Sequence, residues 1–258
     1  MKNKKIPIEI LQILGCMALL LRGTVFLIPS ANISFRPDIP EMVANISVSN
    51  MIGPLAFPIF AFLLVEGFHR TQDFRRYAMG VLLLAAAFEI PSDLLHFWTP
   101  LYGYMNNMFF TLFLSLLALK LLTENWNIFG KIGGIAVLAV ISSALRCEYG
   151  VCGMLMALLF EVTRKLPVKW LYQLFGMLAL AWLIKWLALR GYITAMVGGY
   201  IPVAGKLLES QYLYVLSLIP ISLCDGGQIR GKAFPVVLYA TLPVGYLIMH
   251  WIFCRINF

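Results

Sequence analysis

The stretch that decides the fold is residues 51–68, MIGPLAFPIFAFLLVEGF, in which Glu66 is the only charged residue. About 18 consecutive apolar residues suffice to cross the hydrocarbon core of a bilayer as an α-helix. Apolar runs of comparable length recur along the chain on both sides of this stretch. The sequence therefore predicts nine membrane-spanning helices, at residues 8–29, 51–68, 77–97, 105–123, 131–146, 150–166, 169–190, 210–224 and 233–253.

The composition agrees with lipid as the solvent of most of the chain. Of the 258 residues, 61% are hydrophobic and 12% are charged, and the mean hydropathy is +0.85. Soluble domains use about 45–50% apolar and about 25% charged residues, so this composition excludes a soluble enzyme, a disordered chain and a nucleic-acid-binding domain. We expect an all-α, polytopic integral membrane protein of eight to ten spans. It forms a single domain over residues 1–258, with membrane lipid and no nucleic acid among its partners.

The net charge of +8 indicates orientation, because Lys and Arg resist translocation and collect in cytoplasmic connections. Thirteen of the 20 Lys and Arg residues lie before the first span or at every second connection after it. Five lie at the remaining connections and in the C-terminal tail, and two lie inside spans. This alternation predicts an N-terminus inside and a C-terminus outside. Residues 191–209 are rich in glycine and leave a re-entrant hairpin or one more span open.

Ionisable side chains within a span are costly, so each one is a candidate for function. Glu89 and Asp93 lie four residues apart on one face of the third span, on either side of Pro91. The two carboxyl groups either form an acid/base pair or have a structural role. In the structural role, each one caps a backbone group that Pro91 leaves without a hydrogen bond or pairs with a basic residue on a neighbouring helix. Glu66 and His69, three residues apart at the inner end of the second span, are either a carboxylate–imidazole pair for proton transfer or simply solvated.

Further polar residues lie towards the outer ends of the spans. Asn107 begins the fourth span, either as a helix N-cap or as a contact to substrate. Arg146 and Glu148 lie in the short turn between the fifth and sixth spans, where Arg146 could bind an anion, pair with Asp93 or be solvated. Arg22, in the outer half of the first span, either snorkels to the interface or competes with Arg146 as the counter-charge.

The topology predicts that these residues converge, because a short connection joins the third and fourth spans. We expect a shared cavity near the outer face to bring together Glu89, Asp93, Asn107 and Arg146. His96 and His250, near outer span ends, are interpreted as interfacial rather than catalytic. The spacing of the cysteines suggests no metal site, and pairing of Cys147 with Cys152 is left open.

The sequence resembles the TraX family in three motifs. Residues 52–68, quoted above, closely resemble the family signature. EIPSDL at 89–94, followed by NMFFTL at 107–112, and EYG at 148–150 resemble the next two motifs, the last corresponding to an Asp-Tyr-Gly turn. Their order and spacing agree over about residues 10–165, and the C-terminal third agrees more loosely.

This resemblance implies a multi-span protein of the bacterial inner membrane that is related to the membrane acyltransferases. The family is named for a conjugation protein that N-acetylates pilin. The resemblance therefore implies acyl-CoA, such as acetyl-CoA, as a cytoplasmic co-substrate and a pilin-like or envelope protein as an acceptor. It also implies an essential histidine in the first span.

The chain departs from the family pattern at this histidine. A Lys and an Asp-His pair typical of the first span align here with Gln12, Arg22 and Gly23. A histidine usual in the last span aligns with Gly245, and the Arg usual after the signature glycine is Pro54. Without an imidazole in the first span, either another residue is the general base of acyl transfer or the chain no longer catalyses it.

Three functions remain as alternatives. For acyl transfer, the candidate catalytic groups are Glu89, Asp93 and His69, and the candidate substrate-binding groups are Asn107, Arg146, Glu148, Arg22 and Glu66. The second alternative is a proton- or cation-coupled transporter, which inverted repeats would support, although the sequence shows none. The third is a non-catalytic assembly partner built on the same scaffold.

Overall fold

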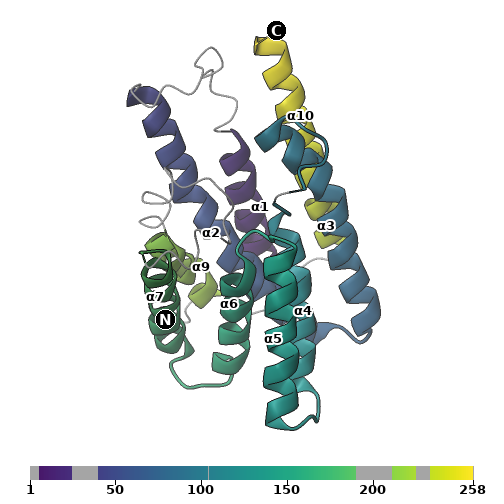
Figure 1. The fold of residues 1–258 in the computed structure, drawn as a ribbon, viewed down its shortest axis with the longest axis vertical. Helices are drawn as coiled ribbons and strands as arrows, with labels where there is room; N and C mark the ends of the chain where they lie inside the picture. Colours follow the sequence, from purple (N-terminus) through teal and green to yellow (C-terminus); the bar gives the residue numbers. More distant parts are fainter. Residues whose placement is uncertain (1–5, 25–39, 104, 190–210, 225–232, 258) are drawn as a thin grey trace.

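The computed structural model describes residues 6–24, 40–103, 105–189, 211–224 and 233–257, and in these ranges the chain is all-helical, with two isolated β-bridges and no strand (Figure 1). The predicted all-α class is confirmed. The helices are α1 (Ile8–Thr24), α2 (Pro40–Arg70), α3 (Phe74–Phe97), α4 (Met108–Thr123), α5 (Ile128–Ala144), α6 (Gly150–Thr163), α7 (Lys169–Leu189), the 3-10 helix η3 (Gln211–Ser217), α9 (Leu218–Leu223) and α10 (Ala233–Asn257).

Each predicted span coincides with a helical segment, although several boundaries differ. α2 begins at Pro40, well before the predicted start at residue 51. α4 begins at Met108 rather than 105, because the Asn107 side chain caps it by accepting a hydrogen bond from Phe109 N at 2.9 Å. The predicted span 210–224 is a 3-10 helix followed by a short α-helix, whose combined rise of about 23 Å falls short of a bilayer core of about 30 Å. The glycine-rich segment 191–209 lies outside the described residues.

α2 is the central helix and packs against α1, α4, α6 and η3. Its residues from Ala56 to Val65 are all buried, as expected for a helix that is apolar on every face. The Phe57 ring stacks on Tyr149 with centroids 4.2 Å apart, and the Phe62 ring meets Phe160 edge-on at 5.9 Å. The stretch that decides the fold therefore forms the aromatic core of the bundle.

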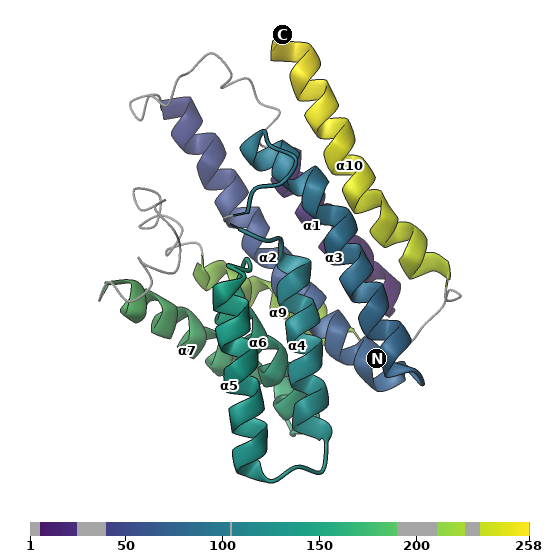
Figure 2. The same ribbon diagram turned by 45° about the vertical axis from the view of Figure 1, so that its right-hand side comes forward.

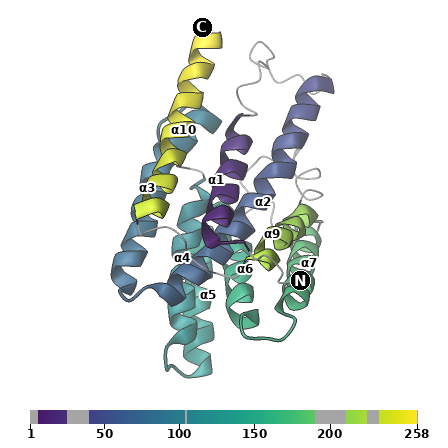
Figure 3. The same cartoon turned by 180° about the vertical axis from the view of Figure 1, so that it is seen from behind.

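On the other side of α2, α1 lies between α2 and α10, and α10 also packs along α3 (Figures 2 and 3). The α1–α10 contact includes a buried hydrogen bond, in which the Tyr246 hydroxyl donates to the Leu19 carbonyl oxygen at 3.0 Å. This packing brings the C-terminal ends of α1 and α3 together, and the functional candidates gather beside them.

Large apolar side chains also cover the outside of the bundle. Examples are Phe129 and Val140 on α5, Phe175 on α7 and Val236 on α10. By length and composition, two helices within the described ranges could cross a membrane, α3 and the part of α10 from Pro235 to Arg255, and shorter apolar helices accompany them. A surface of this kind is typical of a protein in contact with lipid.

Candidate functional site

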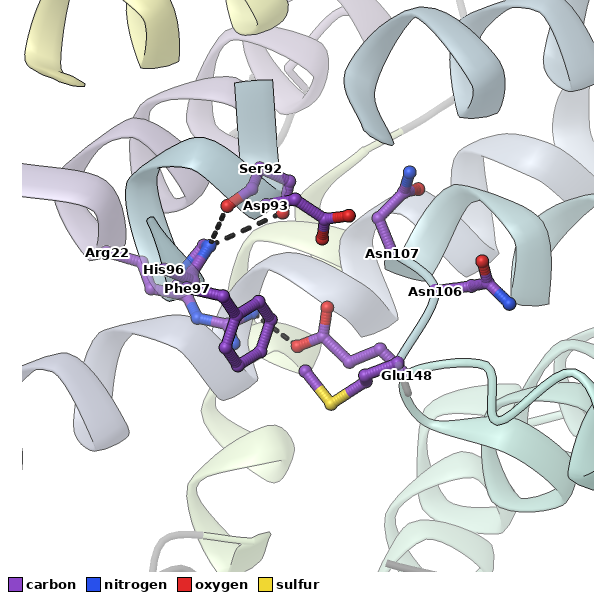
Figure 4. A pocket seen from close by; sticks show the side chains of 9 residues that line it. Arg22, Ser92, Asp93, His96, Phe97, Asn106, Asn107 and Glu148 are labelled. Carbon is purple, nitrogen blue, oxygen red and sulfur yellow. Dashed lines mark hydrogen bonds and ion pairs between the residues drawn. The ribbon is translucent and has the colours of Figure 1, made fainter. Parts of the chain in front are cut away.

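Several of the predicted residues line one small cavity, which we call the α3–α4 pocket (Figure 4). It lies where the C-terminal end of α3, the start of α4, the end of α1 and the turn before α6 meet. Its lining residues are Arg22, Ser92, Asp93, His96, Phe97, Met105, Asn106, Asn107 and Glu148. The cavity has a volume of about 10 Å³, which is about the room that one water molecule needs.

Asp93 is the most deeply buried charged residue of the pocket, with 2% of its surface exposed. Its Oδ2 accepts a hydrogen bond of 2.6 Å from the backbone N–H of Tyr102, in the connection that leads back to α4. The Tyr102 ring stacks on Phe97 with centroids 4.0 Å apart, which holds this connection over the end of α3. Asp93 therefore presents a fixed carboxylate to the cavity.

Glu89 lies one turn deeper on α3 and is held by Asn107. The backbone N–H and the side-chain Nδ2 of Asn107 donate to Glu89 Oε2 at 3.0 Å and 2.5 Å. Asn107 Nδ2 also donates to the Ala85 carbonyl oxygen at 2.8 Å, while Oδ1 caps α4. The N-cap interpretation of Asn107 is confirmed, and a contact of Asn107 with substrate stays a prediction.

The arginine that lines the pocket is Arg22, and its ion pair is with Glu148. Arg22 Nη1 forms an ion pair with Glu148 Oε1 at 2.5 Å, which joins the end of α1 to the turn before α6. Arg146 does not line the pocket, and its side chain is exposed. Its backbone has a φ of 50°, and its carbonyl oxygen accepts from Asn106 N at 3.2 Å, so this residue shapes the turn. The expectation that Arg146 meets Glu89, Asp93 and Asn107 is therefore wrong.

His96 lines the pocket. From the sequence, it was interpreted as a residue at the membrane–water interface. It faces the cavity because Glu89, Asp93 and His96 follow one another at spacings of four and three residues, which puts them on one face of α3. This spacing is the signal that could have found it. His96 Nδ1 lies 2.7 Å from the Ser92 carbonyl oxygen, and its ring lies 5.8 Å from that of Tyr246 on α10.

Glu66 and His69 lie at the far end of α2 and do not form the predicted carboxylate–imidazole pair. Glu66 instead lies 3.5 Å from Arg70 and 3.4 Å from Arg164. His69 Nε2 contacts Glu161 Oε2 of α6 at 2.6 Å, a partner that sequence reasoning missed because it comes from a distant helix. These contacts fasten the ends of α2 and α6 together, away from the α3–α4 pocket.

The family that the chain matches is described as TraX protein, and the match covers residues 40–221, which is well over half of the chain. The chain belongs to the TraX family. The resemblance inferred from the three motifs is thereby confirmed. No curated protein and no solved structure matches the chain.

The TraX match begins after α1 and ends before α10, and these two helices carry the departures from the family pattern other than Pro54. A Cβ atom at Gly23 would lie 2.9 Å from Met249 Sδ and 3.2 Å from the Tyr246 ring. A Cβ atom at Gly245 would lie 2.7 Å from Leu20 Cδ2. Both glycines thus allow α1 and α10 to approach closely, and a histidine at either position would require the neighbouring side chains to shift.

Proposed function

We propose that this TraX-family protein transfers an acyl group from acyl-CoA to an acceptor, such as a pilin-like N-terminus, at the α3–α4 pocket. The observation that carries the proposal is the pocket itself. It combines the buried carboxyl group of Asp93 with the Arg22–Glu148 ion pair around one cavity. Buried charges are costly, and a cluster of them around a cavity is typical of a functional site.

The proposal places the chain in the bacterial inner membrane with its N-terminus inside and the pocket towards the outer side. It therefore requires the acyl group of cytoplasmic acetyl-CoA to reach the pocket from the opposite side of the membrane. The apolar outer surface of the helices supports a membrane location. The connections after α2, α4 and α6 are rich in Lys and Arg, and they lie at one end of the molecule (Figure 1). This arrangement supports the topology, because Lys and Arg collect on the cytoplasmic side of a membrane.

With a volume of about 10 Å³, the pocket must open further to admit a thioester and an amine, and in such an opened pocket its residues could serve acyl transfer to an amine. The amine nitrogen attacks the thioester carbonyl, a C–N bond forms, the C–S bond breaks and the thiol of CoA leaves. Asp93 can bind and orient the amino group of the acceptor. A second N–H of Arg22, beyond the one that contacts Glu148, can stabilise the oxyanion of the tetrahedral intermediate. Acetyl-CoA is the co-substrate that supplies the acyl group.

The test is transfer of radiolabel from acetyl-CoA to protein and envelope components in membranes from cells with and without the gene. The proposal predicts a labelled species that only the membranes with the gene contain. Equal labelling in both membranes under all conditions would favour a non-catalytic assembly role instead.

A further inference from the structure

We propose that one phospholipid binds in a groove between α1 and α10, with an acyl chain along the groove and the headgroup phosphate at Arg255. The proposal rests on the membrane location proposed above and is independent of acyl transfer. Three features of the groove lead to it, namely its apolar lining, its length and the positive charge that lies beyond its end.

The groove lies on α10, at one edge of the bundle (Figure 2). It has a volume of about 510 Å³, within the range of about 300–1,000 Å³ that is usual for ligand sites. The Thr241 hydroxyl donates to the Leu238 carbonyl oxygen at 2.6 Å, so its own helix already engages this polar side chain. The groove therefore offers apolar surface to a ligand. Leu20 of α1 lines it together with residues of α10, which include Val237, Ala240, Thr241, Val244 and Ile248.

The length of the groove suits a single acyl chain. From Val237 to Ile248 an α-helix rises by about 16 Å, and one leaflet contributes about half of a bilayer core of about 30 Å. Trp251 follows one turn after Ile248 and has 59% of its surface exposed. Exposed tryptophans of membrane helices are typical of the membrane–water interface. The chain of a phospholipid can therefore enter the groove from the C-terminal end of α10.

The face of α10 that lines the groove continues to Arg255. Thr241, Ile248 and Arg255 follow one another at intervals of seven residues, which are almost two whole turns. The Arg255 guanidinium carbon lies 5.4 Å from the centroid of the Trp251 ring, in a cation–π contact. This contact holds a positive charge near the end of the groove, where it can bind a phosphate. Because the surrounding lipid is as apolar as the groove, the charge supplies the preference for one lipid.

The same charge favours a phospholipid over a second copy of the chain. A two-fold dimer through this face would bring α10 against its own copy and Arg255 towards Arg255, and like charges repel. Close contact of two membrane helices also needs small residues that are accessible. Gly245 is already used by α1, because a Cβ atom there would lie 2.7 Å from Leu20 Cδ2.

The test places the full chain in phosphatidylcholine vesicles that contain phosphatidylglycerol with a photoactivatable diazirine in one acyl chain. Ala240→Phe fills the groove. Val236→Phe is the matched control, because Val236 is exposed on α10 and does not line the groove. In the wild type and in Val236→Phe, we expect the label to concentrate on residues 237–248. In Ala240→Phe, labelling of these residues should fall to the level of other exposed helix faces, such as that around Phe129 on α5.

A second pair of variants tests the phosphate contact without altering the groove. Arg255→Gln removes the charge, and Arg75→Gln removes an exposed charge at the start of α3. In the wild type and in Arg75→Gln, unlabelled phosphatidylglycerol should compete for the site about fivefold better than phosphatidylcholine does. In Arg255→Gln the two lipids should compete equally.

Three results would overturn the site. Labelling spread evenly over the exposed helix faces, and unchanged by Ala240→Phe, would leave only general contact with lipid. A dimer in native mass spectrometry that Ala240→Phe dissociates would assign the groove to a second copy of the chain. Both results would leave the membrane location standing, whereas a chain that does not sediment with membranes would overturn the location as well.

Discussion

At the scale of single residues, the α3–α4 pocket depends on side chains that serve two partners at once. Asn107 caps α4 with its oxygen and holds Glu89 with its two nitrogens. The sequence sufficed to place Glu89, Asp93 and Asn107 together, because helical spacing and a short connection determine it. It could not choose between Arg22 and Arg146, because that choice depends on how α1 packs beside the turn before α6.

Replacement of Asn107 by alanine should therefore cost more than the loss of a helix cap. Asn127 supplies the matched control, since its Oδ1 caps α5 at Gly130 N at 2.7 Å in an exposed position. We expect Asn127→Ala to lower the free energy of unfolding by about 1 kcal/mol. Asn107→Ala should lower it by about 2–3 kcal/mol, because Glu89 also loses a buried partner. Unfolding in detergent measures both, and equal losses would contradict the dual role.

The thiol of Cys147 offers a test of burial at the turn before α6. All five cysteines are free in the structure, and Cys147 and Cys152 do not form a disulfide there. Burial, partly offset by a hydrogen bond with Ser142, raises the pKa of Cys147 to about 11. Because the thiolate is the reactive form, its maleimide labelling should be at least about a hundredfold slower at pH 8 than that of an exposed cysteine, and should accelerate up to about pH 11. Fast labelling at pH 7 of a variant with Cys147 alone would contradict this burial.

At the scale of helices, apolar runs sufficed to predict roughly where each described helical segment lies, whereas they did not predict the helix ends. Capping by Asn107 and Asn127 fixed the starts of α4 and α5 at positions that hydropathy alone does not mark. The contacts between helices were also beyond the sequence, as His69 shows by its pairing with Glu161 across α2 and α6. Some helices also approach each other closely at glycines, and the sequence alone does not show which glycines these are.

Gly153 is the clearest of these glycines. A Cβ atom there would lie 2.5 Å from Phe57 Cζ and 2.8 Å from Thr111 Cγ2, between α2 and α4. Gly153→Ala should therefore lower the free energy of unfolding by about 1–3 kcal/mol through overpacking. Gly133 on α5 has open space at the same position, so Gly133→Ala should raise it by up to about 1 kcal/mol. Thermal unfolding in detergent measures the pair, and the same sign for both would contradict the packing.

At the scale of the whole molecule, the composition sufficed to predict helices with an apolar exterior, and the alternation of charge predicts which end faces the cytoplasm. The nine crossings that the sequence predicts would place the C-terminus outside, with α10 as the last span. Two reporter proteins fused after residue 258 test this location of the C-terminus. We expect activity from a reporter that works only outside the cytoplasm, and no activity from one that works only in the cytoplasm. A cytoplasmic C-terminus would require an even number of crossings and would contradict the topology on which the location of the α3–α4 pocket rests.

The most direct test of acyl transfer at the α3–α4 pocket compares two identical substitutions at the two ends of α3. Asp93 lines the pocket, whereas Asp73 caps the start of α3 by accepting from Arg76 N at 3.1 Å, a role that asparagine can fill equally well. In membranes supplied with radiolabelled acetyl-CoA, Asp73→Asn should transfer label as fast as the wild type, and Asp93→Asn should be slower by about a hundredfold or more. Transfer by Asp93→Asn at the wild-type rate, or none by the wild type itself, would contradict a catalytic role for this pocket.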